Sequence, residues 1–247
     1  MVSSNNLDLD RARAYPYDIP QRSYLLSADG PRELAAGQRL PDLGDRHPVI
    51  ASGSNQSPQQ LARKFDALDS APIPVLRSRI KNFDSVYSPH FSAYGSIAAT
   101  LQYCHGVTAD VFTTWLNDAQ LQRMHETEAL GINYDFCSLA GVHVDIDGAG
   151  LRETVFAYIG RRGALAHNNQ PIALAAVPAQ GRQWPAMTQE QVQTLARDRL
   201  SPNLDMDRFI GENIEHDTTR HDRTDRLAAD AVPFSYAGYR RLDIEKS

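Results

Sequence analysis

The strongest constraint on the fold is a run of strand-like sequence between residues 73 and 116. Short segments rich in β-branched and aromatic residues follow one another there, separated by turn residues such as Gly95 and Gly106. The expected strands are Val75 to Ile80, Phe83 to Tyr87, Ile97 to Gln102 and Val107 to Leu116. Such a run argues against a regular alternation of strands and helices. We therefore expect an α+β fold with a mixed, largely antiparallel sheet that can close into a small barrel.

A strand, a tight turn and a helix are expected just before this run. Pro48 to Ser52 is a short apolar segment typical of a buried strand, and Gly53-Ser54-Asn55 follows as the turn. Ser57-Pro58 then places a serine N-cap before a proline at the first helical position. This pattern predicts a helix that reaches Phe65 or Leu68.

A second helix and a hairpin are expected after the run. Asn117 is a candidate N-cap, and Gln120 stands where a capping box requires it. Further on, Tyr134 to Asp147 and Leu151 to Gly160 alternate as strands around an Asp-Gly turn. Both helices should therefore cover the sheet from outside.

The two ends of the chain differ in pattern from its middle. Residues 1–46 are rich in Arg, Asp, Pro and Tyr and show no sustained period, so we expect an irregular N-terminal arm. Thr188 with Gln191 predicts another helix to about Leu200, and the charged segment from Asp205 to Asp230 is compatible with amphipathic helix. The expected division is an arm (1–46), a domain (47–180) and a helical C-terminal extension (181–247).

Composition limits the classes of protein to consider. The chain has 247 residues, 42% of them hydrophobic, and a formal net charge of −5. These values fit a globular protein without a basic surface for nucleic acid. No apolar run is long enough to span a bilayer, no secretory signal begins the sequence, and two cysteines are too few for a disulfide framework. We expect a cytoplasmic protein with no nucleic-acid or membrane partner; the oligomeric state stays open.

One carboxylate on the second helix stands in an unusual position. Helical spacing places Glu128 on the apolar stripe of Leu121, Met124 and His125, whereas Glu126 lies on the opposite face. An inward carboxylate near the C-terminal end of a helix loses hydration and meets an unfavourable dipole, and both effects favour proton uptake near neutral pH. The alternative is a structural carboxylate that pairs with an arginine or caps a turn.

Several motifs follow one another between residue 48 and about residue 160: Ser52-Gly53-Ser54-Asn55 with Leu61 six residues on, Arg79 with Phe83, the strand around Gly95 and Thr100, the acidic helix end at Glu128, and the tyrosines Tyr134 and Tyr158. In these motifs and their order the segment resembles the gamma-glutamylcyclotransferase-like family, also known as AIG2-like or BtrG-like. The chain departs from the family at Ser52, where tyrosine is usual, and at Ala129, where glycine is usual.

The resemblance implies a reaction and a set of site residues. Glu128 would be the catalytic general base and acid, and Ser52, Gly53, Ser54, Asn55, Tyr134 and Tyr158 would bind the substrate. The reaction would cyclise a gamma-glutamyl amide or amine to 5-oxoproline and release the amine, with no metal and no organic cofactor. Two alternatives remain: a non-catalytic small-molecule binding or regulatory protein on the same fold, and an amidohydrolase of a related small amide.

Overall fold

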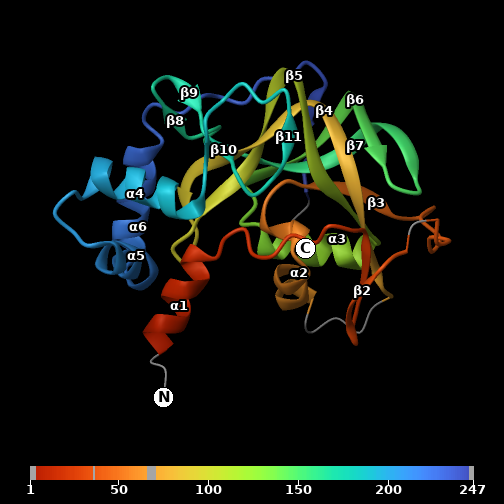
Figure 1. Cartoon of the computed structure of the whole chain (residues 1–247), viewed down its shortest axis with the longest axis horizontal. Helices are drawn as coiled ribbons and strands as arrows, with labels where there is room; N and C mark the ends of the chain where they lie inside the picture. Colours follow the sequence, from red (N-terminus) through yellow and green to blue (C-terminus); the bar gives the residue numbers. More distant parts are fainter. Residues whose placement is uncertain (1–3, 36, 66–70, 245–247) are drawn as a thin grey trace.

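The centre of the molecule is a closed barrel of five strands. The computed structural model describes residues 4–35, 37–65 and 71–244. The barrel strands are β3 (His47–Ala51), β4 (Ile73–Phe91), β5 (Ile97–Leu116), β6 (Tyr134–Ile146) and β7 (Gly150–Gly160). The hydrogen-bonded order is β5-β3-β7-β6-β4, and β4 also pairs with β5, which closes the circle. Among these five strands, β3 and β7 pair in parallel and the other neighbouring strands pair antiparallel. The expected α+β class, the mixed sheet and the barrel are confirmed (Figure 1).

The four strands expected between residues 73 and 116 are two long, bent strands. β4 continues past Asn82, which has a φ of 63°, and β5 continues past Gly106, which has a φ of 83°. The Gly106 N–H donates to Asn82 Oδ1 at 2.9 Å, and the β4–β5 register shifts between Lys81 and Phe83. The turn-like residues therefore make a bulge that bends the pair without ending it.

The helices α2 and α3 begin where the sequence predicts. α2 (Pro58–Phe65) starts at the predicted proline; the alternative end at Leu68 lies outside the described residues. α3 (Asp118–Thr127) has the full capping box: the Asn117 side chain accepts from the Gln120 N–H, and the Gln120 side chain accepts from the Asn117 N–H. Figure 1 shows both helices beneath the barrel.

The N-terminal arm contains more regular structure than its sequence suggests. It holds α1 (Ser4–Arg13) and a hairpin of β1 (Tyr24–Ser27) and β2 (Gly30–Glu33). β1 extends the sheet by pairing with β4, Tyr24 opposite Val75. Strands of four residues are too short to show a period in the sequence, and pairing with a neighbour stabilises them.

The C-terminal third combines short strands with three helices. Its strands are β8 (Ala166–His167), β9 (Gln170–Pro171), β10 (Ala173–Leu174), β11 (Ala179–Gln180), β12 (Ala186–Met187) and β13 (Tyr239–Arg241). Its helices are α4 (Gln189–Leu200), α5 (Met206–Glu215) and α6 (Asp217–Leu227), which lie together on one side of the barrel (Figure 1). The capping box of Thr188 and Gln191 is present at the start of α4.

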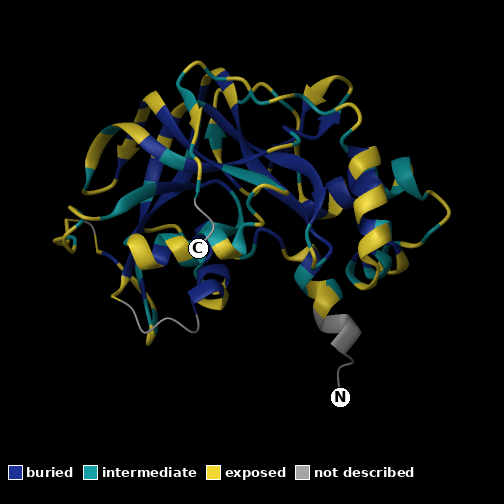
Figure 2. Ribbon diagram, turned by 180° about the vertical axis from the view of Figure 1, so that it is seen from behind, coloured by how far each residue is buried: buried dark blue, intermediate teal, exposed yellow. Residues whose placement is uncertain are grey.

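A shared core joins these parts. Tyr15 of the arm, Phe209 of α5 and Leu227 of α6 are buried in the same cluster as side chains inside the barrel, such as Leu76 and Val111. Figure 2 shows the barrel strands largely buried and the outer faces of the helices exposed. Within the described residues, every helix is too short or too polar to cross a membrane. The division into three domains stays a prediction.

Candidate functional site

One cavity brings together the turn after β3 and the end of α3. Its volume is about 270 Å³, near the lower end of the range of small-molecule sites, which is roughly 300–1,000 Å³. Gly53, Ser54, Asn55 and Glu128 all line it. A cavity of this size suits a ligand about as large as an amino acid. The residues predicted to be adjacent in the fold are therefore adjacent.

Glu128 points into the cavity from the end of α3. Its side chain is 10% exposed, whereas that of Glu126 is 53% exposed, as the helical spacing predicts. Glu128 is the C-cap residue, and the following Ala129 has a φ of 47°, in the left-handed region that favours glycine. The chain turns at Ala129 and leaves the carboxylate facing the barrel.

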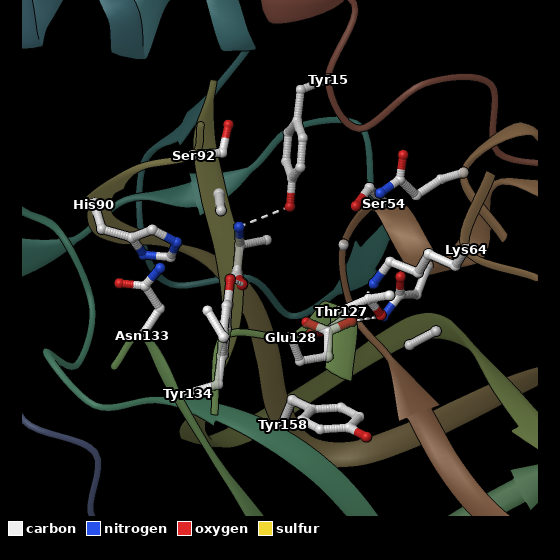
Figure 3. A pocket seen from close by; sticks show the side chains of 18 of the residues that line it. Tyr15, Ser54, Lys64, His90, Ser92, Thr127, Glu128, Asn133, Tyr134 and Tyr158 are labelled. Atoms are coloured by element: carbon white, nitrogen blue, oxygen red, sulfur yellow. Dashed lines mark hydrogen bonds and ion pairs between the residues drawn. The ribbon is translucent and has the colours of Figure 1, made fainter. Parts of the chain in front are cut away.

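Two neighbours hold the Glu128 carboxylate. Asn55 Nδ2 donates to Glu128 Oε1 at 2.8 Å, and the Lys64 ammonium forms a buried ion pair with the same oxygen (Figure 3). Sequence reasoning missed Lys64, which stands on the inner face of α2 beside Gln60, four residues before it. The available signal was a lysine next to the apolar positions of a short helix. The structural alternative was a carboxylate that pairs with an arginine or caps a turn; Glu128 is the C-cap residue, and its ionic partner is a lysine.

The turn residues 52–54 line the cavity and also contact other parts of the chain. The Ser52 carbonyl accepts from the Ser85 hydroxyl, which fixes the end of β3. At Gly53, an added Cβ would lie 2.5 Å from Tyr15 Oη and 2.9 Å from Ala99 Cβ. A side chain at position 53 would therefore clash with Tyr15 and Ala99, so glycine is required here whether or not a ligand is bound.

Tyr134 and Tyr158 both line the cavity, and both hydroxyls have protein partners. Tyr134 Oη donates to the Ala99 carbonyl at 2.9 Å. Tyr158 Oη lies 2.7 Å from Nδ1 of His125. Burial lowers the pKa of His125 and raises that of Tyr158, so a neutral imidazole and a neutral phenol share this hydrogen bond. The predicted tyrosines are at the cavity, and their role as substrate ligands stays a prediction.

The far end of the cavity is polar and uncharged. His90, Ser92 and Asn133 line it, and sequence reasoning missed all three (Figure 3). Burial lowers the pKa of His90 to about 3, with a smaller effect from Arg162, so the imidazole is neutral at physiological pH. Its Nδ1 is 3.1 Å from the Ser88 hydroxyl. These side chains offer neutral hydrogen-bonding groups to a ligand.

Within the described ranges, no three His, Cys, Asp or Glu side chains are grouped so that they could hold a metal ion. The polar groups of the cavity are amides, hydroxyls, one imidazole, one carboxylate and one ammonium. These groups can position a small polar molecule and transfer a proton.

Comparisons with known proteins give matches only among solved structures. No protein-family model and no curated protein matches the chain. A gamma-glutamyl cyclotransferase is similar with a TM-score of 0.38 and 14% identity over 78% of this chain and 92% of that one. An uncharacterized protein from Homo sapiens has a TM-score of 0.39, with the same identity and coverage. A protein from Arabidopsis thaliana, known from a solution structure, has a TM-score of 0.36 and 14% identity over 48% of this chain and 71% of its own. These solved structures thus include one whose name is that of the activity in the resemblance noted from the sequence motifs.

Proposed function

We propose that the protein is a gamma-glutamylcyclotransferase-like enzyme that converts a gamma-glutamyl amide or amine to 5-oxoproline and a free amine. The observation that carries this proposal is the position of Glu128. Its carboxylate is almost fully buried, faces the turn of residues 53–55, and lies in a cavity of amino-acid size. A buried carboxylate beside an amide-rich turn suits a reaction that moves a proton between two nitrogens.

The chemistry needs little from the protein beyond orientation and proton transfer. The alpha-amine of the substrate attacks its own gamma-carbonyl carbon, and holding the two groups together can supply several kcal/mol of barrier reduction. Glu128 takes the proton that the amine loses and returns it to the leaving nitrogen as the old C–N bond breaks. Asn55 keeps the carboxylate in place through its hydrogen bond to Oε1.

The neutral far end of the cavity would receive the leaving amine. His90, Ser92 and Asn133 carry no formal charge there, because the histidine is neutral. Such a surface favours an uncharged, polar leaving group.

A cytoplasmic location is part of the same proposal. It agrees with the state of the two cysteines, Cys104 and Cys137, which are both free and buried.

The test is product formation by matched variants. We expect purified protein to release 5-oxoproline from at least one member of a panel of gamma-glutamyl amines and amino acids. Glu128→Gln should lower kcat by at least about 10²-fold, the lower range for general acid–base catalysis, with an unchanged circular dichroism spectrum. Glu126→Gln removes an exposed carboxylate on the same helix and should leave kcat unchanged. Turnover that survives in Glu128→Gln would refute the mechanism.

A second candidate is a binding protein without turnover. The buried ion pair of Glu128 with Lys64 favours it, because a carboxylate that already has a cationic partner can serve a purely structural role. In that case 5-oxoproline or glutamate would raise the melting temperature, and no gamma-glutamyl compound would be consumed. An amidohydrolase would instead release glutamate, so the identity of the product separates all three functions.

A further inference from the structure

The N-terminal arm contributes a side chain to the cavity. Tyr15 follows α1 in the arm, outside the region that resembles the family, and its ring enters between the turn after β3 and strand β5. The residue is only 5% exposed. Figure 3 shows its hydroxyl directed towards the middle of the cavity, on the side opposite Tyr158. The arm is therefore part of the cavity wall.

The Tyr15 oxygen accepts hydrogen bonds from the backbone. The Ala99 N–H donates to Tyr15 Oη at 2.7 Å, and the Ser54 N–H is also directed at this oxygen. Over the part of the chain that the structure describes, no group accepts the proton of the phenol. Burial raises the pKa of Tyr15 far above neutral, so the proton is retained. Two N–H groups on the oxygen polarise the O–H bond and make it a better donor.

The position of the phenol is closely fixed. Gly53 and Ala99 flank the oxygen, and at Gly53 even a methyl group would clash with it. Ala99 is fixed in turn by Tyr134, whose hydroxyl donates to the Ala99 carbonyl. Glu128 lines the same cavity and interacts electrostatically with Tyr15. A rigid donor and a proton-accepting carboxylate thus face one small space.

We propose that Tyr15 donates a hydrogen bond to the gamma-carbonyl oxygen of the substrate and stabilises the negative charge that develops on it. This inference rests on the proposed function. As the amine nitrogen bonds to the gamma-carbon, the carbonyl π pair moves onto oxygen, and the Tyr15 O–H stabilises it without transferring its proton. The pair returns when the leaving C–N bond breaks, and Glu128 passes the proton from the attacking nitrogen to the leaving one.

The alternative role for Tyr15 is to block the substrate site, which is called the plug role below. Ser54 is one of the residues predicted to bind the substrate, and its N–H is directed at the Tyr15 oxygen, so Tyr15 could instead block the turn. The two roles have opposite consequences when the hydroxyl is removed. A donor to the transition state lowers kcat when lost, whereas a plug raises activity when lost.

The experiment compares two tyrosines of the same arm. Tyr15→Phe removes the donor and keeps the ring, and we expect kcat to fall on the order of 10²-fold, as for loss of one oxyanion-hole donor, while KM stays within about threefold. Tyr17→Phe is the control: its hydroxyl accepts from Arg11 at 3.4 Å, and the residue does not line the cavity. It should keep the wild-type kcat. Thermal melting of all three proteins measures their stability.

Each outcome has a single meaning. A wild-type kcat in Tyr15→Phe, or a higher one, overturns the inference and leaves the proposed function standing. Wild-type protein that forms no 5-oxoproline ends the proposed function and this inference with it. If Tyr15→Phe does not fold, 3-fluorotyrosine and 3,5-difluorotyrosine at position 15 keep the ring and the hydroxyl. We then expect kcat to change with the acidity of the phenol, and a kcat independent of it would overturn the inference.

Discussion

Among the described residues, the Arg182–Asp84 and Lys64–Glu128 ion pairs are both buried but differ in their surroundings. Arg182 binds Asp84 with two hydrogen bonds, at 2.9 and 2.8 Å, and its Nη2 also donates to the Val177 carbonyl at 2.7 Å. The Asp84 side chain is 0% exposed. Lys64 instead reaches Glu128 through one oxygen, beside a cavity.

The polar groups around the second pair are less completely satisfied. Within the described ranges, Asn55 Oδ1 and Gln60 Oε1 are buried without a hydrogen-bond partner, and both residues line the cavity. A buried polar atom without a partner calls for an explanation, and a bound ligand or water is one such explanation. We infer that the Arg182–Asp84 pair holds a loop to the barrel, whereas the Lys64–Glu128 pair is open to a ligand.

The largest expected effect is the loss of unfolding free energy when the Arg182–Asp84 pair is broken. Arg182→Met leaves the Asp84 carboxylate buried without a partner, and we expect a loss of about 3–5 kcal/mol of unfolding free energy in urea titrations. Arg79→Met is the matched control, because the Arg79–Asp145 pair is exposed, and it should change stability by less than about 1 kcal/mol. Equal losses in the two variants would remove the distinction between them.

A double-mutant cycle tests the second pair. Lys64→Met and Glu128→Gln each leave the other group without its partner, and the double variant removes both charges together. We expect a coupling energy of about 1–3 kcal/mol from urea unfolding of the three variants and the wild type. Strictly additive losses would mean that the two side chains do not interact in solution.

The smallest expected effect concerns the backbone that places Glu128. Ala129→Gly relieves a left-handed conformation, and we expect a gain of about 0.5–1 kcal/mol in unfolding free energy with unchanged activity. Ala228→Gly is the contrast. Ala228 caps α6 with an unstrained φ of −84°, so we expect this variant to lose unfolding free energy instead. A loss in both variants would contradict strain at Ala129.

The sequence predicts local structure better than it predicts partners. Capping boxes at Asn117 and Thr188 depend on residues three apart, and both are present. The inward direction of Glu128 follows from helical spacing alone and is also correct. Asn82 shows the limit of this approach: a turn-forming residue marks a bulge or a strand end equally well, and only pairing with the opposite strand decides between them.

Site residues from distant parts of the chain escaped prediction. Lys64 and His90 reach the cavity because α2 packs under the barrel and β4 runs its full length, and neither residue belongs to a recognisable motif. Tyr15 is further away still, in a segment without a period. The function of such residues depends on tertiary contacts, which a single sequence does not encode in any local pattern.

The parallel contact of β3 with β7 also affects how the protein is made. It joins Val49 to Phe156, so more than half of the polypeptide must leave the ribosome before the barrel can close. Until then one edge of β3 stays without its neighbour, and an open edge of this kind readily associates with other chains. Nascent chains that stop short of β7 should therefore depend on chaperones, although they already carry both the Gly53 turn and Glu128.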